Sequence, residues 1–192
     1  MAVQQEHMRL WNQVFPLLLD MAPGRVCIIG VQDDLPRGGL VRDRFEEAGW
    51  DADELDLHDP RANIVHDLNE GVVWEICRRY DVVFDIGSLE HVANSHKALE
   101  TYLLMLKPGG KLMLLTPIKG YYDHGFHTFS HEYIASTMAA NRMPVEHVWY
   151  LDKRGPVISS PDEADDVCIV GIWRNDGFSM PLKTVQQKRW VK

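Results

Sequence analysis

The sequence predicts an α/β fold in which a mostly parallel sheet carries helices on both faces and one antiparallel strand at an edge. Short apolar runs that suit buried strands alternate with segments of helical periodicity along most of the 192 residues. The run Val82-Val83-Phe84 is apolar on both faces, as a central parallel strand requires. Two strand segments at 145–151 and 167–173 are separated only by a loop, and this late pair predicts the antiparallel strand.

The length and composition fit one domain spanning residues 1–192. Apolar residues make up 45% of the chain and charged residues 25%, which is ordinary for a globular protein with a packed core. The sequence shows no internal repeat and no sign of a second domain. We therefore divide the chain into an N-terminal helix at 3–21, a core at 24–173 and a polar C-terminal tail at 174–192.

An amphipathic helix opens the predicted fold. Its apolar residues recur at helical spacing over 3–21, and they are Leu10, Trp11, Val14, Phe15, Leu18 and Leu19. Pro16 lies in the middle of this segment and is expected to kink or split the helix, because proline has no backbone N–H. The next elements are a buried strand over 25–31, a helix over 39–48 ending at Gly49, strands over 52–57 and 64–65, and a helix over 72–79.

The second half begins with the strand over 81–86. A helix follows, with Asn94 or Ser95 as its cap. Its apolar face holds Leu99, Tyr102, Leu103 and Leu106. Pro108-Gly109-Gly110 end that helix before an apolar strand over 111–116, and Ser130 can cap a helix over 131–140.

Two polar segments are predicted near the end of the chain. The stretch 152–166 carries Pro156 and Pro161, so we expect an exposed loop there. The tail contains three apolar residues that are candidates to pack on the domain or on a partner: Phe178, Met180 and Trp190.

Charge and composition exclude several classes of partner. The formal net charge of −8 argues against a protein that follows a nucleic-acid backbone, which needs a basic face. No apolar run is long enough to cross a membrane, and the N-terminal residues do not resemble a secretory signal. Three widely separated cysteines, Cys27, Cys77 and Cys168, fit buried free thiols better than disulfides or zinc ligands. A cytoplasmic protein is predicted.

Two segments carry a resemblance to a known family. DIGSLEHV at 85–92 ends one strand, and LKPGGKLMLLTP at 106–117 leads from the following helix into the next strand. Together they resemble the fourth strand, its helix and the fifth strand of class I S-adenosylmethionine (SAM)-dependent methyltransferases, especially the group that methylates small molecules and sugars. The resemblance covers residues 24–173 and implies a Rossmann-like methyltransferase fold with a seven-stranded or reduced sheet and SAM as cofactor.

The resemblance implies a cofactor site at the carboxyl ends of the strands, where ligands of open parallel sheets bind. In the family, the residues that match Gly87 and Ser88 lie against the methionine part of the cofactor. The pair that matches Glu90 and His91 walls the site. The alternative is that Glu90 and His91 only hold the loop before the next helix.

Acidic residues follow the second and third predicted strands. Asp56 matches the family acid that holds both ribose hydroxyls, since a carboxylate offers two oxygens to two donors. Asp67 resembles the acid that reaches the adenine amino group, and Leu68 and Asn69 fit a frequent variant of that segment. The stretch between the two acids is short, so we expect its helix to be reduced to a turn. Either cofactor affinity is then low, or a second copy or partner subunit covers that edge.

The first turn departs from the family pattern. In VCIIGVQDD at 26–34, Gly30 matches the first glycine, Ile28 replaces an acid, and Gln32 and Asp34 replace the second and third glycines. These glycines normally let the backbone approach the ligand. Gln32 therefore puts a side chain in the cofactor site, and Asp33 and Asp34 would place negative charge near the cofactor's carboxylate.

The segment 117–133 is rich in aromatic residues and histidines. It resembles the family segment that lies over the methyl-transfer site, so Tyr121, Tyr122 and Phe126 are candidates to wall an acceptor pocket. His124 or His127 can take a proton from an acceptor hydroxyl, because imidazole titrates near neutral pH. The alternative for each histidine is a hydrogen-bonded loop residue.

The sequence does not predict a metal site. Four histidines are candidates to converge with Glu90 or Asp123, and they are His91, His124, His127 and His131. His127 and His131 would share one face only on a continuous helix, yet Ser130 marks a helix start between them.

Three functions remain from the sequence. The leading prediction is SAM-dependent methyl transfer to a small hydroxylated or amino acceptor, such as a sugar or secondary metabolite. A second is a non-catalytic methyltransferase-like subunit that has lost the cofactor. A third is a histidine-based lyase, isomerase or hydrolase on the same scaffold, because fold does not fix function. The expected partner is a small-molecule acceptor.

Overall fold

The computed structural model describes residues 2–3, 8–19, 21–71 and 74–186. Within this part of the chain, eight strands form one sheet in the order β5-β4-β2-β6-β7-β10-β8-β9. Their bounds are β2 (Arg25–Ile29), β4 (Asp51–Asp56), β5 (Ile64–Val65), β6 (Tyr80–Ile86), β7 (Leu106–Lys119), β8 (Val145–Asp152), β9 (Val157–Ile158) and β10 (Val167–Arg174). A separate parallel pair joins β1 (Ala2–Val3) to β3 (Asp33–Asp34).

The sheet is parallel from β5 to β7 and antiparallel at its other end. The chain starts in the middle at β2, moves outward through β4 to β5, and returns to β6 on the other side of β2. Strand β10 runs antiparallel between β7 and β8, and β9 ends the sheet antiparallel to β8. The order reverses between β2 and β6, which is where open α/β sheets bind ligands. The predicted α/β Rossmann-like architecture is confirmed, with two differences. Among the described residues the sheet has eight strands where seven or fewer were expected, and the antiparallel strand β10 lies inside the sheet and not at its edge.

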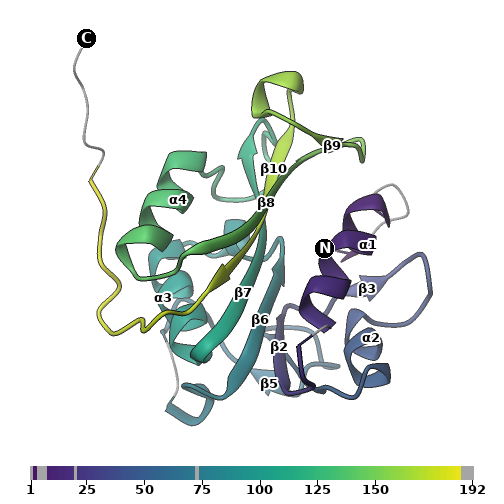
Figure 1. Ribbon diagram of the computed structural model, residues 1–192, viewed down its shortest axis with the longest axis vertical. Coiled ribbons are helices and arrows are strands. Elements are labelled where there is room, and N and C mark those ends of the chain that lie inside the picture. The colour runs from purple at the N-terminus through teal and green to yellow at the C-terminus, as the bar shows by residue number, and fades with distance from the viewer. Residues whose placement is uncertain (1, 4–7, 20, 72–73, 187–192) are drawn as a thin grey trace.

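Helices cover both faces of the sheet (Figure 1). One face carries α1 (Met8–Leu19) and α2 (Val41–Glu47), and the other carries α3 (Ser95–Met105) and α4 (His131–Ala140). Each central strand sends alternate side chains to the two faces, because side chains alternate along a strand. In β2, for example, Val26 and Ile28 pack under α1 and α2, whereas Cys27 and Ile29 pack on the α3 side.

Four of the five predicted helices hold, with corrections at their ends. Val3 lies in β1 and not in the first helix. Leu106, expected on the apolar face of α3, begins β7, so Pro108-Gly109-Gly110 lie within that strand.

In α1 the helix continues through Pro16 instead of splitting, because Val14 and Phe15 before it and Leu18 after it are all buried in the core. Residues 4–7 and 20 of the predicted helix lie outside the described residues. The start of α2 at Val41 is two residues later than expected. The caps of α3 and α4 are as predicted, with Asn94 accepting from Lys97 N and Ser130 accepting from Tyr133 N.

The helix predicted over 72–79 is wrong for its described part. Residues 74–79 hold only the short 3-10 helix η2 (Trp74–Ile76), and residues 72–73 lie outside the described chain. Trp74 is 78% exposed, so the segment lacks the buried face that would stabilise a longer helix. The expected reduction between the second and third strands is confirmed, because β4 and β5 are joined by a turn.

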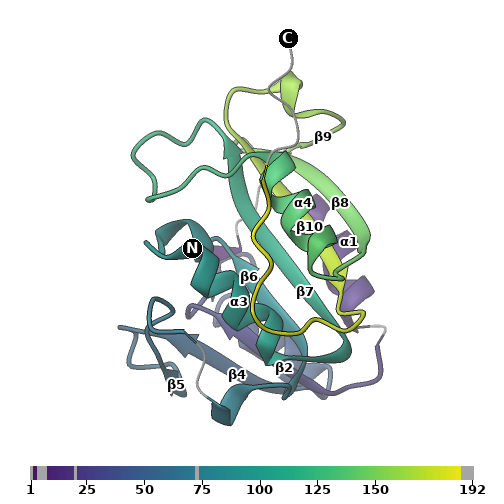
Figure 2. The same cartoon turned by 90° about the vertical axis from the view of Figure 1, so that its left-hand side faces the viewer.

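The loop at 152–166 adds the edge strand β9 to the sheet, and the tail packs on the α3 side. The loop contains β9 and the 3-10 helix η4 (Pro161–Glu163). Figure 2 shows the tail crossing the side that carries α3 and α4. Phe178 and Leu182 are buried there, and Leu182 N donates to Glu100 Oε1 of α3 at 2.7 Å. Met180 is half exposed, and Trp190 lies outside the described residues. None of the described helices has the length and apolar character needed to cross a membrane.

Candidate functional site

A cleft of about 290 Å³ opens at the carboxyl ends of β2, β4 and β6. This volume is near the lower end of the range for small-molecule sites, roughly 300–1,000 Å³. Seven of the eight predicted cofactor-binding residues line it: Gly30, Gln32, Asp56, Asp67, Gly87, Ser88 and His91. The eighth, Glu90, is buried behind His91 and does not line this cleft.

Gln32 folds back onto β2. Its Nε2 donates to the carbonyl oxygen of Ile29 at 3.1 Å, and Ser88 Oγ donates to the same oxygen at 3.0 Å. Gly30 lies between the two side chains with φ +74°, and an added Cβ would come within 2.9 Å of each. The bend at Gly30 therefore requires glycine, and the tied-back amide of Gln32 leaves the cleft open.

The two acids after Gln32 do not line the cleft. Asp34 is buried and accepts two hydrogen bonds from Arg44 of α2, one of them at 2.9 Å. Asp33 pairs with Arg61 at 3.1 Å in the turn after β4. The repulsion expected from Asp33 and Asp34 is therefore offset by two arginines, one on each side of the turn.

Asp56 ends β4 and organises the wall of the cleft. Its Oδ2 accepts from Val31 N at 3.1 Å, and its Oδ1 accepts from His58 N and Asp59 N at 2.8 and 3.0 Å. Partial burial alone would raise the pKa of Asp56, but these three N–H donors together hold it below its usual value. Because a carboxylate has about four acceptor positions, Oδ2 keeps capacity for a ligand donor.

Asp67 and its neighbours form the other end of the cleft. Asp67 Oδ1 accepts from Asn69 N and from Asn69 Nδ2, both at 2.8 Å, and these bonds lower the pKa of Asp67. His66 Nε2 lies 2.5 Å from the carbonyl oxygen of Gly71. Leu68 adds an apolar contact to this end.

A second cleft of about 350 Å³ adjoins the first. It is lined by His91, Asp123, His124, Gly125 and Phe126, so His91 belongs to both clefts. Among the predicted acceptor-binding residues, only Phe126 lines it. Tyr122 is 94% exposed, and Tyr121 is half-buried against the α1 side of the core, with its N–H donating to Asp166 Oδ1.

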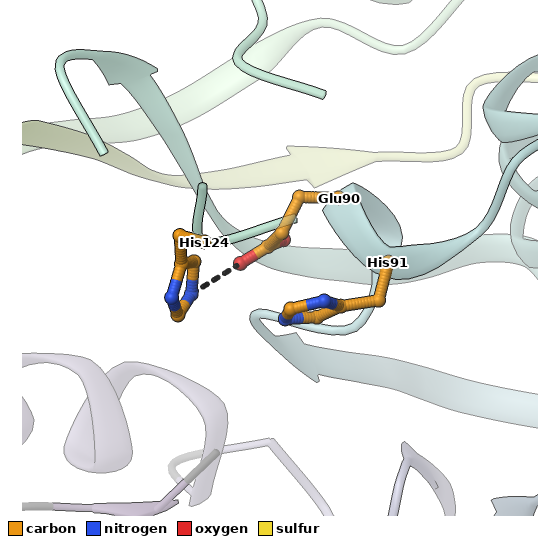
Figure 3. A group of neighbouring side chains, drawn as sticks. All are labelled: Glu90, His91 and His124. Carbon is orange, nitrogen blue, oxygen red and sulfur yellow. Dashed lines mark ion pairs between the residues drawn. The ribbon is translucent and has the colours of Figure 1, made fainter. Parts of the chain in front are cut away.

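Three predicted residues meet where the clefts join: Glu90, His91 and His124 (Figure 3). Glu90 and His91 come from the 3-10 helix η3 (Leu89–His91), and His124 comes from the loop after β7. His124 Nε2 lies 3.8 Å from Glu90 Oε1, and the rings of His91 and His124 meet edge to face at 5.1 Å. Burial raises the pKa of Glu90 to about 8, and the nearby Asp85 carboxylate adds to the rise.

The other two histidines of the segment lie apart from this group. His127 Nε2 is 3.1 Å from the carbonyl oxygen of Ala93, and its ring stacks on Phe129. His131 packs edge to face against Tyr150. The structure thus gives His127 and His131 hydrogen-bonding and packing contacts, and leaves His124 as the loop histidine beside Glu90.

Two supporting residues were not predicted from the sequence. Asp85, at the end of β6, accepts from Ser88 N at 2.7 Å and from Leu89 N at 3.1 Å, which shapes the turn below the cleft. Thr116 of β7 donates to Glu90 Oε2 at 3.2 Å. The sequence offered one signal for each: Asp85 lies near the end of the predicted strand 81–86, and Thr116 ends the predicted strand 111–116.

Comparisons with known proteins agree with this architecture. A family model described as a methyltransferase domain matches residues 18–166. No curated protein matches the chain in sequence.

Several solved methyltransferase structures share the fold. One is 1,6-didemethyltoxoflavin-N1-methyltransferase from Burkholderia thailandensis, solved with 1,6-didemethyltoxoflavin and S-adenosylhomocysteine (SAH). It is 16% identical over 89% of this chain and 79% of that chain, with TM-score 0.59. N-methyltransferase NodS from Bradyrhizobium japonicum, solved with SAH, is 17% identical over 91% and 89% of the chains, with TM-score 0.58.

A third similar structure is geranyl diphosphate C-methyltransferase from Streptomyces coelicolor, solved with Mg²⁺, geranyl diphosphate and SAH. It is 13% identical over 88% of this chain and 81% of that chain, with TM-score 0.60. The strand order, the cleft at the strand ends and the match over 18–166 lead to one conclusion: the chain belongs to the methyltransferase-domain family.

Proposed function

We propose that this protein transfers a methyl group from SAM to a small hydroxylated or amino acceptor. The observation that carries the proposal is the pair of adjoining clefts that share His91. One lies where the family fold binds its ligand, and the other opens beside it under an aromatic residue, Phe126. A cofactor in the first cleft and an acceptor in the second would therefore be in contact beside His91.

The residues of the first cleft fit the proposed cofactor. Gln32 Oε1 is a buried acceptor that has no hydrogen-bond partner among the described residues, and Gln32 lines the cleft. An ammonium group is a suitable donor to such an oxygen. Asp56 is the candidate for the ribose hydroxyls through Oδ2, and Asp67 for the adenine amino group.

The chain's own contribution to the reaction is positioning. SAM, when bound, supplies a methyl group on a sulfonium sulfur: an acceptor oxygen or nitrogen bonds to the methyl carbon, the carbon–sulfur bond breaks, and the thioether SAH leaves with the electron pair. Gly30 and Ser88 shape the floor of the cofactor cleft, and the wall around Asp56 is held by three backbone bonds. His91 and His124 line the acceptor-side cleft, with Glu90 buried beside them, and can bind an acceptor hydroxyl and assist loss of its proton.

The similar structures support a small acceptor. The Burkholderia and Streptomyces enzymes were solved with 1,6-didemethyltoxoflavin and with geranyl diphosphate, which are both small molecules. The open 350 Å³ cleft beside His124 has a volume suited to molecules of that size. Cys27 and Cys168 are buried thiols outside any disulfide, which suits the reducing cytoplasm, and a cytoplasmic location stays our prediction.

Calorimetric titration with SAH tests the proposal. We expect one molecule to bind per chain, and Asp56→Ala to weaken binding by about 10–100-fold, the loss of one or two hydrogen bonds to a charged group. Asp59→Ala is the matched control, because Asp59 lies three positions away, pairs with Arg61 and does not line the cleft. Absence of heat with the unaltered protein would refute the proposal and favour the non-catalytic alternative.

A further inference from the structure

The three residues where the clefts join have the geometry of a metal site. One ligand atom each from Glu90, His91 and His124 lies within 4.8 Å of the other two. Figure 3 shows the Glu90 carboxylate with the His124 ring on one side of it and the His91 ring on the other. Two imidazoles and one carboxylate are a donor set that suits zinc and other divalent transition metals.

The spacing of Glu90 and His124 fits two ligands of one ion better than a direct hydrogen bond. Their closest atoms, Glu90 Oε1 and His124 Nε2, are 3.8 Å apart. A charge-assisted hydrogen bond between these groups would be about 2.7–2.9 Å long. Two atoms bound at about 2.05 Å to a tetrahedral ion lie about 3.4 Å apart. A shift of a few tenths of an ångström would therefore suffice for this pair.

Glu90 has one oxygen anchored and one oxygen free. Its Oε2 accepts from Thr116 Oγ1, whereas its Oε1 is buried and has no hydrogen-bond partner in the described part of the chain. The side chain is 0% exposed. Burying a carboxylate oxygen without a hydrogen-bond donor costs free energy, and a cation bound at that oxygen would offset this cost.

The backbone fixes His124 opposite this oxygen. The N–H groups of Phe126 and His127 both donate to the carbonyl oxygen of Glu90, at 2.8 and 3.2 Å. Gly125 lies so close that an added Cβ would be 2.9 Å from the same carbonyl oxygen. The loop that carries His124 is therefore attached to the residue that carries the free carboxylate oxygen, although the two are far apart in sequence.

We propose that Glu90, His91 and His124 bind one divalent transition-metal ion, with Zn²⁺ the best match to the donor set. Three protein ligands leave at least one coordination position open, as in catalytic zinc sites. Because His91 and His124 line the second cleft, an ion held by them would be accessible to an oxygen of the acceptor and would lower the pKa of an acceptor hydroxyl, in place of direct proton transfer to an imidazole. Only this last step rests on the proposed methyl transfer, since metal binding needs no SAM.

The test measures metal binding directly. The protein, freed of metal with a chelator, is titrated with Zn²⁺ by calorimetry and with Co²⁺ by visible absorption, which reports the coordination of the ion. We expect one ion per chain and a Co²⁺ spectrum typical of four or five ligands. His124→Ala is expected to weaken binding by about 100-fold or more, and Thr116→Val, which removes the hydrogen bond that orients Glu90, by about 10-fold.

His127→Ala is the matched control, because His127 lies in the same loop but bonds Ala93 and is not part of the group. It should bind Zn²⁺ as the unaltered protein does. Failure of the unaltered protein to bind, or equal binding by His124→Ala, would overturn the proposal. SAH binding is measured on the same samples. Metal binding without SAH binding would support the metal site and refute only the proposed methyl transfer.

Discussion

Arg44 binds both carboxylate oxygens of Asp34 in an ion pair that is almost closed to solvent. Asp34 occupies the position of a glycine in the family turn, so this pair explains how the chain keeps an acid there. The arginine comes from α2, immediately after the turn, and directs the carboxylate away from the cleft. The turn is thus supported from one side by Arg44 and from the other by the pair of Asp33 with Arg61.

Removing Arg44 should destabilise the fold. Arg44→Met leaves the Asp34 carboxylate buried without a partner, a change that typically costs about 3–5 kcal/mol. Urea unfolding of the unaltered protein and of Arg44→Met measures this loss of stability. The double variant Asp34→Asn with Arg44→Met should recover most of the loss, because no charge is then buried. Arg37→Met, which breaks an exposed pair with Glu47, is the control and should change little. Equal losses in both single variants would contradict the buried pair.

Gln32 is expected to assist cofactor binding and not to obstruct it. Gln32→Leu removes the unpartnered Oε1, and SAH affinity should fall by about 10-fold or more, the usual value of one hydrogen bond to a charged group. Calorimetry with 5′-methylthioadenosine is the control, because that ligand lacks the ammonium and should bind both proteins alike. A gain in SAH affinity in Gln32→Leu would mean that the glutamine blocks the cleft.

Asp85 should make stability depend on pH. Burial raises the pKa of Asp85 to about 6, although N–H donors and Tyr102 act against the rise. The folded protein therefore keeps a proton that the unfolded chain has lost, so this stabilising contribution is complete below about pH 4 and is lost as pH rises through 6. The contribution of Asp85 to the free energy of unfolding should fall by about 3 kcal/mol across this pH range.

Urea unfolding of the unaltered protein and of Asp85→Asn between pH 4 and pH 7 tests this pH dependence. The difference in the free energy of unfolding between the two proteins should change by about 3 kcal/mol over this pH range. Glu90 and Tyr102, the titratable groups beside Asp85, are present in both proteins. Asp176→Asn is the control, since Arg174 lowers the pKa of that exposed acid and its contribution is lost only at lower pH. An unchanged difference would show that Asp85 does not hold the proton.

The tail should contribute to stability through Phe178. This side chain is 6% exposed and packs in the core on the α3 side. Phe178→Ala should lower the free energy of unfolding by about 3 kcal/mol or more, as for other buried phenylalanines. Met180→Ala, at a half-exposed position two residues further on, should change it by less than about 1 kcal/mol. Similar effects would mean that the tail is not part of the core.

The sequence predicts the strands of this fold better than its short helices. The run Val82-Val83-Phe84 is buried in β6 as expected, because a run that is apolar on both faces fits few places besides a central strand. Residues 74–79 look helical by local pattern, yet only η2 forms among them. Whether a short apolar segment becomes a helix depends on a face to pack against, which local sequence does not reveal.

The site divides in the same way. Gly87, Ser88 and Asp56 follow predicted strands, so topology alone places them at the cleft. The Asp34 carboxylate is turned away from the cleft by Arg44, ten residues further on, and no local sequence motif predicts that pair. The approach of His124 to Glu90 depends on how the loop after β7 folds back, which is a tertiary contact between distant segments.

The attachment of the loop after β7 to the Glu90 carbonyl has an evolutionary consequence. The backbone of this loop is held by its own amide groups, while Tyr122 and Phe126 extend into solvent with 94% and 73% of their surface exposed. Of the two, only Phe126 lines the second cleft, so substitution there changes the cleft without disturbing a buried side chain. If that cleft binds the proposed acceptor, descendants of this chain can vary the acceptor at Phe126 with little effect on folding.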